Sequence, residues 1–318
     1  MKIAFINAYN ELNQNQAMFY SDSQLGIDLF ANARRTRDRL TKIGHMVFSP
    51  YNFSAAATAD VVVFLDRPRG DINHYRSLLQ ICNRSVLIDG ELDAWLDTPA
   101  DEFQCTIRLT YHPSAWNGKG TIAFNTYAVD TEQLRESDPA DILKRPAGFS
   151  MLSTNHYRDF DGELYSLRRE AVQFFGQKFP DQLSLGGRGW NDPKIKFIGA
   201  VARKAEFLRA RQFNFCFENC AKVSGYITEK LLESILCGCI PIYYSIGHDK
   251  DLIPQDVYIN AARFSNWDEL VAHCMSLTDA EKVAIVSAGK NWLMSDQARL
   301  FQLDHSVDTL VNAVLGTA

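Results

Sequence analysis

The chain has 318 residues, a formal net charge of −5, 46% hydrophobic residues and 22% charged residues. These values are typical of a globular protein of about two domains, and the acidic net charge argues against a dedicated nucleic-acid-binding protein. The sequence contains no run of about 18 apolar residues, so no transmembrane helix is expected. Its first residues lack the pattern of a secretory signal peptide. We therefore expect a cytoplasmic protein without a membrane anchor, with peripheral membrane contact left open.

The seven cysteines are Cys82, Cys105, Cys216, Cys220, Cys237, Cys239 and Cys274. An odd number of cysteines, most of them in apolar strand or helix patterns, is typical of reduced, buried thiols. A metal site built from the four central cysteines is disfavoured. Cys216 alternates with phenylalanines of a predicted strand, and Cys237 lies on the helix that follows.

The first third of the chain alternates short apolar runs with helical patterns. Strands are predicted over residues 3–7, 45–49, 59–66 and 85–89, and helices over residues 25–43 and 75–82. The run at 59–66 is continuously apolar, as in a parallel strand that is buried on both faces. Alternating strands and helices predict a parallel, doubly wound sheet. No Gly-x-Gly-x-x-Gly motif follows the first strand, which argues against a dinucleotide site there.

Glu91 follows Gly90 directly after the predicted strand over residues 85–89. A carboxylate at the carboxyl end of a buried strand is placed to face a ligand cleft. There it could act as a general base on a hydroxyl group. The pattern alone favours a simpler interpretation, in which Glu91 is a solvated turn residue.

Two further strands are predicted between residues 104 and 124. The segment between them contains Tyr111, His112 and Trp116, whose rings could stack against a sugar. We interpret it instead as a hairpin-like loop with aromatic packing.

Pro139, Pro146 and Gly148 lie among charged residues and are typical of a domain boundary. The sequence thus predicts a first domain over residues 1–146 and a second over residues 147–300. A helix over residues 301–318 would pack back on the first domain.

The second domain is predicted to begin with a strand over residues 149–154. Asp159-Phe-Asp161 follows it and forms a D-x-D triplet, a pattern whose two carboxylates can bind a metal ion. Here it precedes Gly162 and a helix instead of closing a buried strand. We interpret it as loop and helix-terminal charge, with metal binding disfavoured.

The next helix, over residues 164–175, carries the adjacent arginines Arg168 and Arg169. On the pattern alone both are surface residues. Later elements are a Gly-rich turn over 184–190, a basic helix over 204–211, a strand over 257–260, and helices over 267–277, 280–292 and 300–315.

Residues 213–244 predict a strand, a polar loop, a helix and a second strand. Thr228 is a plausible N-cap of the helix, and Glu229 and Lys230 occupy its first turn. A helix N-terminus favours phosphate because of its unpaired N–H groups, and Lys230 adds a full charge. Glu229 suits sugar hydroxyls as an acceptor. The pattern indicates a ligand that is part sugar and part phosphate, or else an ordinary amphipathic helix with a charged first turn.

Three motifs in this stretch resemble a known signature. Phe-x-Phe-Glu-Asn at 215–219, Gly-Tyr-Ile-Thr-Glu-Lys-Leu at 225–231 and Cys-Ile-Pro-Ile-Tyr-Tyr at 239–244 are similar to those of the α1,3/α1,4-fucosyltransferases, glycosyltransferase family 10, of the soluble bacterial or viral type. The resemblance covers residues 149–245 well and is thin over the first domain.

The resemblance implies a GT-B fold, an α/β architecture of two Rossmann-like doubly wound domains that face a central cleft. The first domain would bind the acceptor and the second the nucleotide sugar. It also implies an inverting transfer of fucose from GDP-fucose to a hydroxyl of an oligosaccharide or glycoconjugate. No cofactor is expected, and a divalent metal is not expected to be essential.

The resemblance also implies roles for individual residues. Glu91 would be the catalytic base, and Arg168 would contact the donor phosphates, with Arg169 as the alternative because a one-residue slip is hard to exclude. Lys230 and the helix N-terminus at Thr228 would offset charge on the departing diphosphate.

The remaining implied residues surround the donor. They are Glu229 at the fucose or ribose hydroxyls, Asn219 and Tyr226 in the donor pocket, and Glu218 as a further candidate for donor binding.

Two alternatives remain open at the level of sequence. One is a GT-B enzyme with a different nucleotide sugar, including an enzyme that glycosylates modified DNA bases, although the acidic net charge disfavours nucleic acid as a partner. The other is a non-catalytic nucleotide-sugar-binding module that has kept the fold and lost the base.

Overall fold

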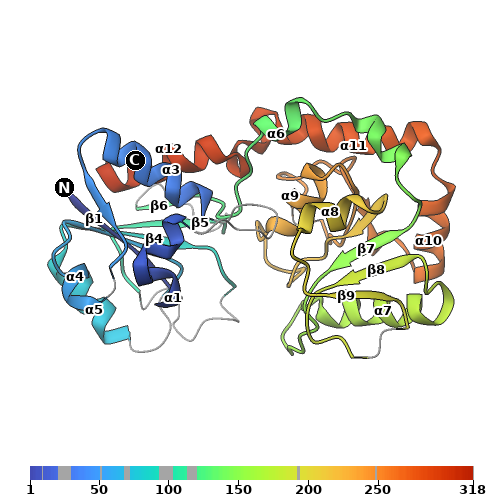
Figure 1. Ribbon diagram of the computed structural model, residues 1–318, viewed down its shortest axis with the longest axis horizontal. Helices are drawn as coiled ribbons and strands as arrows, with labels where there is room; N and C mark the ends of the chain where they lie inside the picture. Colours follow the sequence, from blue (N-terminus) through green and yellow to red (C-terminus); the bar gives the residue numbers. More distant parts are fainter. Residues whose placement is uncertain are drawn as a thin grey trace. The chain divides into compact units, whose positions relative to one another are not determined.

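The structure is a computed structural model (Figure 1). It describes residues 1–8, 10–20, 30–50, 52–67, 72–92, 103–112, 120–191, 194–247 and 249–317. The described residues form two compact units. The first combines residues up to Ala128 with the C-terminal segment from Leu300, and the second runs from Val129 to Arg299.

The first unit is built on a six-stranded parallel sheet of order β2-β1-β3-β4-β5-β6. Its strands are β1 (Lys2–Asn7), β2 (Met46–Phe48), β3 (Val61–Leu65), β4 (Arg84–Asp89), β5 (Ile107–Thr110) and β6 (Thr121–Ala123). Its helices are α1 (Asn10–Asn13), η1 (Gln14–Gln16), α2 (Ala17–Tyr20), α3 (Ala31–Lys42), α4 (Phe53–Ala56), α5 (Ile72–Ile81) and α12 (Leu303–Leu315).

Both faces of this sheet are buried, because successive side chains of a strand point to opposite faces. Ile3 and Phe5 of β1 belong to a core cluster that includes residues of α3 and α12. Ala4 and Ile6 belong to a second cluster that includes residues of α4 and α5. Helices therefore cover the sheet on two sides, as a doubly wound sheet requires.

The interpretation of residues 104–124 as a hairpin-like segment is wrong. β5 and β6 pair in parallel, with Arg108 opposite Thr121 and Thr110 opposite Ala123. A hairpin joins antiparallel strands, whereas parallel strands need a crossover connection. Tyr111 and His112 stack with ring centroids 4.2 Å apart, and Trp116 lies outside the described residues.

The second unit repeats the plan with a parallel sheet of order β12-β11-β10-β7-β8-β9. Its strands are β7 (Phe149–Leu152), β8 (Leu183–Gly186), β9 (Lys196–Gly199), β10 (Phe213–Phe215), β11 (Ile240–Tyr243) and β12 (Ile259–Asn260). Its helices are α6 (Glu132–Arg135), η5 (Pro139–Lys144), α7 (Tyr165–Lys178), α8 (Lys204–Arg209), α9 (Glu229–Leu236), η6 (Ala261–Arg263), α10 (Trp267–Ser276) and α11 (Asp279–Leu293); η7 (Asp296–Phe301) precedes α12.

Two parallel, helix-flanked sheets confirm the predicted α/β, doubly wound class. Residues 129–146, which the sequence assigned to the first domain, belong to the second unit. The reason is local packing: η5 lies against α11, and the Lys290 ammonium donates to the Ser137 carbonyl at 2.6 Å.

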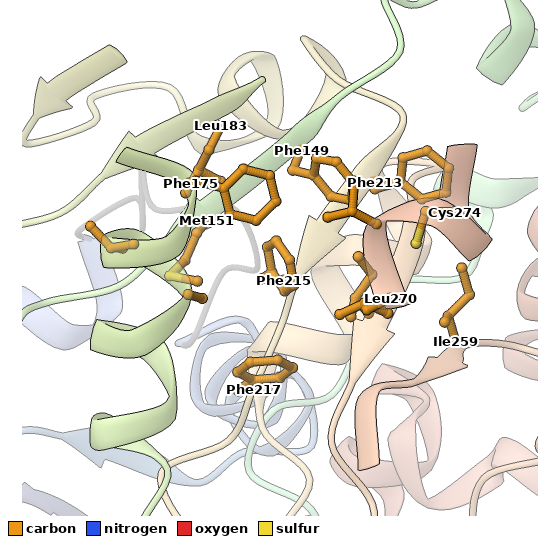
Figure 2. Close-up of a cluster of buried hydrophobic side chains, with 14 of the residues drawn as sticks. Phe149, Met151, Phe175, Leu183, Phe213, Phe215, Phe217, Ile259, Leu270 and Cys274 are labelled. Carbon is orange, nitrogen blue, oxygen red and sulfur yellow. The ribbon is translucent and has the colours of Figure 1, made fainter. Parts of the chain in front are cut away.

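The core of the second unit is aromatic (Figure 2). The ring of Phe149 lies 5.0 Å from that of Phe175 on α7, and 5.3 and 5.5 Å from those of Phe213 and Phe215 on β10. Phe217 continues the series beyond the strand and lies 5.6 Å from Phe215. This packing holds α7 against β7 and β10, and the candidate site is built at the start of α7 and beyond the end of β10.

None of the helices in the described ranges combines the length and apolar character that a bilayer crossing needs. The seven cysteines, all of which are described, form no disulfide. Burial raises the pKa of Cys239 and of Cys274 to about 12.

Candidate active site

Arg168 is buried at the second turn of α7, with 4% of its surface exposed. Its Nη2 donates to the carbonyls of Phe217 and Glu218, both at 2.5 Å, and to Asn219 Oδ1 at 3.1 Å. Burial lowers the pKa of Arg168, while Tyr165 and Glu218 oppose that effect. Its Nε and Nη1 make no hydrogen bond within the described parts of the chain. Arg168 thus holds the chain beyond β10 with one nitrogen and keeps two for another acceptor.

Arg169 occupies a different environment from its neighbour. Its Nη1 donates to the His156 carbonyl at 2.6 Å, and its guanidinium lies 5.3 Å from the Tyr157 ring centroid. It also lines a pocket of about 320 Å³ beside Val172 and Trp190. The structure therefore brings Arg168, and not Arg169, to the end of β10.

Glu218 lies beneath the N-terminus of α9 and is 1% exposed. Its Oε1 accepts from the Thr228 N–H at 2.7 Å, and its Oε2 accepts from the Thr228 hydroxyl at 2.6 Å. The same Oε2 lies 3.6 Å from the Lys230 ammonium. Burial raises the pKa of Glu218, and the charge of Lys230 opposes that rise.

Lys230 and Glu229 form an ion pair in the first turn of α9, where Thr228 caps the helix by accepting from the Lys230 N–H. The ammonium donates to Thr228 Oγ1 at 2.9 Å and to Glu229 Oε1 at 3.2 Å. Burial would raise the pKa of Glu229, but the charges of Lys230 and Lys204 lower it to about 2. Burial would lower the pKa of Lys230, but Glu229 and Glu218 raise it. Both groups are therefore charged at neutral pH.

Asn219 and Tyr226 connect Arg168 to the segment that leads into α9. Asn219 accepts from Arg168 through Oδ1 and donates from Nδ2 to the Tyr226 hydroxyl at 3.1 Å. Tyr226 is 3% exposed. The structure thus gathers one set of predicted residues, which we call the α9 cluster: Arg168, Glu218, Asn219, Tyr226, Thr228, Glu229 and Lys230.

The charges of the α9 cluster balance, with two cations, Arg168 and Lys230, and two carboxylates, Glu218 and Glu229. Lys230 and Glu229 remain partly exposed, with 18% and 21% of their side chains accessible, whereas Glu218 is enclosed. A helix N-terminus with an adjacent ammonium favours phosphate oxygens. The arrangement can therefore bind an anion at one point and hydroxyl donors at another.

A second ion pair behind this cluster was missed at the level of sequence. Lys204 of α8 pairs with Glu233 of α9, whose side chain is 4% exposed. A cavity of about 20 Å³ is lined by both members of this pair and by Lys230, Asn214 and Cys216. Glu229, Lys230 and Glu233 lie in consecutive turns of one helix, and that spacing was the signal available in the sequence.

Glu91 lies in the first unit, directly after β4, and is partly buried. The Gly90 N–H donates to Asp66 Oδ1 at 2.9 Å, and the Tyr111 hydroxyl donates to the Glu91 carbonyl at 3.2 Å. The turn that carries Glu91 is therefore held from the ends of β3 and β5.

A buried ion network braces the strand beneath this turn. Asp89, the last residue of β4, accepts from Arg67 Nε at 2.8 Å and from Arg108 Nε at 2.8 Å. The side chains of Arg67 and Asp89 are fully enclosed. Sequence reasoning missed this network, because a charged residue within an apolar strand pattern gives no sign of its partner.

The Asp159/Asp161 triplet is exposed in the structure. Asp161 Oδ1 lies 2.5 Å from the ammonium of Lys222. Among the described residues, no group of three or more His, Cys, Asp or Glu side chains is arranged to hold a metal ion.

The comparison with protein families gives a match within the second unit. Residues 182–285 match the model of "Glycosyltransferase family 10 (fucosyltransferase) C-term".

Two curated relatives match over short stretches. The α-(1,3)-fucosyltransferase FucT of Helicobacter pylori is 40% identical over 72 residues, which are 22% of this chain and 15% of that protein. An α-(1,4)-fucosyltransferase of Arabidopsis thaliana is 34% identical over 68 residues, which are 21% of this chain and 17% of that protein. The matches thus span less than a fifth of either relative.

Solved structures are similar over nearly the whole chain. An α1,3-fucosyltransferase with GDP-fucose has a TM-score of 0.54 at 17% identity, covering 90% of this chain and 81% of that one. Anabaena HepE in complex with UDP has a TM-score of 0.62 at 12% identity, covering 99% and 100%. The likeness to these structures confirms the predicted GT-B fold.

Proposed function

Since residues 182–285 carry the C-terminal domain of glycosyltransferase family 10, we propose that the protein is a fucosyltransferase. It transfers fucose from GDP-fucose to a hydroxyl of an oligosaccharide or glycoconjugate acceptor, with inversion at the anomeric carbon. The first unit binds the acceptor and the second binds the donor.

The observation that carries this proposal is the α9 cluster. Two cations, Arg168 and Lys230, flank one helix N-terminus, and Arg168 keeps two nitrogens without a partner among the described residues. Charge-assisted hydrogen bonds to phosphate are among the strongest in proteins. The diphosphate of the donor accepts from Arg168, Lys230 and the first N–H groups of α9.

The partly exposed carboxylate beside this anion site suits a sugar. Glu229 is fully ionised at neutral pH and accepts hydrogen bonds only. It holds hydroxyls of the fucose or the ribose. Asn219 and Tyr226, which fix each other through one hydrogen bond, form the adjacent wall of the donor pocket.

Glu91 takes the proton in the transfer step. The acceptor oxygen attacks the anomeric carbon of fucose, its proton passes to the Glu91 carboxylate, and the bond from that carbon to the phosphate oxygen breaks to release GDP. The transition state resembles an oxocarbenium ion, as in glycoside chemistry. Arg168 and Lys230 stabilise the charge that develops on the departing diphosphate.

The donor is identified by measuring release of free nucleotide from GDP-fucose, GDP-mannose and UDP-glucose, with binding of GDP and UDP measured separately. We expect turnover of GDP-fucose that is lost in Glu91→Gln, with GDP affinity retained. Nucleotide binding without turnover by the unaltered protein indicates a non-catalytic module. Preference for UDP-glucose supports the alternative donor, which is favoured by the fold similarity to HepE in complex with UDP.

Metal independence is part of the same proposal, because two cations already face the diphosphate. We expect GDP-fucose turnover to persist in EDTA. Loss of turnover in EDTA with recovery in Mn²⁺, and loss of that recovery in Asp159→Asn/Asp161→Asn, would reassign the charge stabilisation to the D-x-D triplet.

A further inference from the structure

Glu218 contacts both cationic residues of the α9 cluster, Arg168 and Lys230. Its backbone carbonyl accepts from Arg168 Nη2 at 2.5 Å. Its carboxylate accepts twice from Thr228 and lies 3.6 Å from the Lys230 ammonium. One residue therefore connects α7, which carries Arg168, to the first turn of α9, which carries Lys230.

Both oxygens of the Glu218 carboxylate are hydrogen-bonded inside the protein. Each oxygen accepts one hydrogen bond from Thr228, and only 1% of the residue is exposed. A group in this position cannot reach a bound nucleotide without breaking these bonds. Burial of a carboxylate costs free energy unless hydrogen bonds and a countercharge compensate it, and Thr228 and Lys230 supply both.

The contacts at Thr228 and Lys230 favour a carboxylate over an amide. Thr228 presents two donors, its N–H and its hydroxyl, and the hydroxyl oxygen in turn accepts from Lys230 at 2.9 Å. A glutamine offers one acceptor oxygen and a donating NH₂ group. Facing the Thr228 hydroxyl, the NH₂ group would have to donate to an oxygen that already accepts from the Lys230 ammonium and the Lys230 N–H. The amide also carries no charge opposite Lys230, so it is a poor replacement for the carboxylate although it has the same shape.

We propose that Glu218 is a positioning residue that sets the separation of Arg168 and Lys230, and that it makes no contact with the donor itself. It fixes the Thr228 cap, the cap orients the Lys230 ammonium, and the Glu218 carbonyl fixes Arg168. This inference rests on the proposed function for the identity of the ligand, but the positioning itself is testable without any ligand.

The ligand-free test is amide hydrogen exchange of the Glu218→Gln variant, with Glu170→Gln as the matched control. Glu170 is an exposed glutamate on α7 outside the cluster. We expect residues 225–236 to exchange about 10-fold faster or more in Glu218→Gln, because lost hydrogen bonds lower the local opening free energy. Residues 279–293 of α11 should be unchanged in both variants. Equal exchange of residues 225–236 in Glu218→Gln and Glu170→Gln would overturn the proposal.

The ligand test is a double-mutant cycle for GDP affinity with Glu218→Gln and Lys230→Met. Because Glu218 acts through Lys230, Glu218→Gln should weaken GDP binding about 10-fold when Lys230 is present. In the Lys230→Met background the same substitution should weaken it less than about 2-fold. Equal losses in both backgrounds would mean that Glu218 acts on the donor by another route, and would overturn the proposal. If the unaltered protein binds no GDP, the proposed function fails, and hydrogen exchange still decides the role of Glu218.

Discussion

Two adjacent arginines of α7 differ in every contact that the structure describes. Arg168 is buried, lies over the Tyr165 ring and donates to three acceptors beyond β10, whereas Arg169 lies over the Tyr157 ring and donates to one carbonyl. The resemblance favoured Arg168 and kept Arg169 as the alternative. The choice depends on which face of α7 packs inward, and Ala171 and Phe175, both fully buried, place position 168 on that face.

This difference predicts unequal effects of the same substitution. Arg168→Met should lower the free energy of unfolding by about 2–4 kcal/mol, because the carbonyls of Phe217 and Glu218 lose their buried donor. Arg169→Met should cost less than about 1 kcal/mol. Urea unfolding of the two variants checks this, and GDP affinity should fall only in Arg168→Met. Similar losses in both variants would contradict the assignment.

The ion pair of Glu229 predicts a dependence of stability on pH. The pKa of Glu229 falls from its ordinary value of 4.5 to about 2 on folding. A carboxylate with a lowered pKa stabilises the folded state above its unfolded pKa, and this stabilisation is lost as the pH falls toward the folded value. Between pH 5 and pH 3, the free energy of unfolding should therefore fall by on the order of 1–2 kcal/mol more in the unaltered protein than in Glu229→Gln.

Urea titrations at those two pH values measure this difference. Lys230→Met serves as a second control, because it removes the largest charge that lowers the pKa of Glu229. An identical pH dependence in the unaltered protein and in Glu229→Gln would show that the pair is not formed in solution.

At the scale of the element, most strands and helices were predictable because their patterns are strong. The N-cap at Thr228, the helix over α9 and its end at Gly238, which has a φ of +63°, all follow from local residues. The direction of β6 was not predictable. A strand of three residues carries no signal for parallel or antiparallel pairing, since that choice depends on which neighbour it bonds.

The turn after β8 makes a close approach that only glycine allows. Gly187 has a φ of +124°, and a Cβ built there would lie 1.9 Å from the Ser153 carbonyl oxygen at the end of β7. Gly187→Ala should therefore lower the free energy of unfolding by about 3 kcal/mol or more, since the backbone must move. Gly199 has a φ of +76° and open space around it, so Gly199→Ala should cost only about 1–2 kcal/mol. The free energies of unfolding of both variants, measured by chemical denaturation, separate the cost of the close Cβ contact from the cost of the positive φ.

At the scale of the whole molecule, the C-terminal helix α12 belongs to the core of the first unit. Leu310 and Val314 are completely buried against a cluster that includes Ile3 and Val63 of the first sheet. The polar face of α12 meets α3 through exposed ion pairs, among them Arg35 with Asp304 at 3.2 Å. The sequence predicted a helix here that packs back on the first domain, and α12 lies in the first unit with its apolar face on that sheet.

The two faces of α12 should respond differently to substitution. Leu310→Ala should lower the free energy of unfolding of the first unit by about 2–5 kcal/mol, because a fully buried leucine leaves a cavity. Asp304→Asn should change it by less than about 1 kcal/mol, since exposed ion pairs contribute little. Thermal unfolding with separate probes for the two units measures both. Equal effects would show that α12 does not pack on the sheet in solution.

The return of α12 to the first sheet has a consequence for synthesis on the ribosome. The described part of the second unit ends at Arg299, whereas the first unit needs residues 303–315 to cover one face of a sheet whose first strand begins at Lys2. We expect the second unit to become protease-resistant first during translation, while the first unit stays incomplete until residues 303–315 have emerged. Nascent chains arrested soon after residue 299 has left the exit tunnel, and treated with protease, would show this order, and protection of the first unit in such chains would refute it.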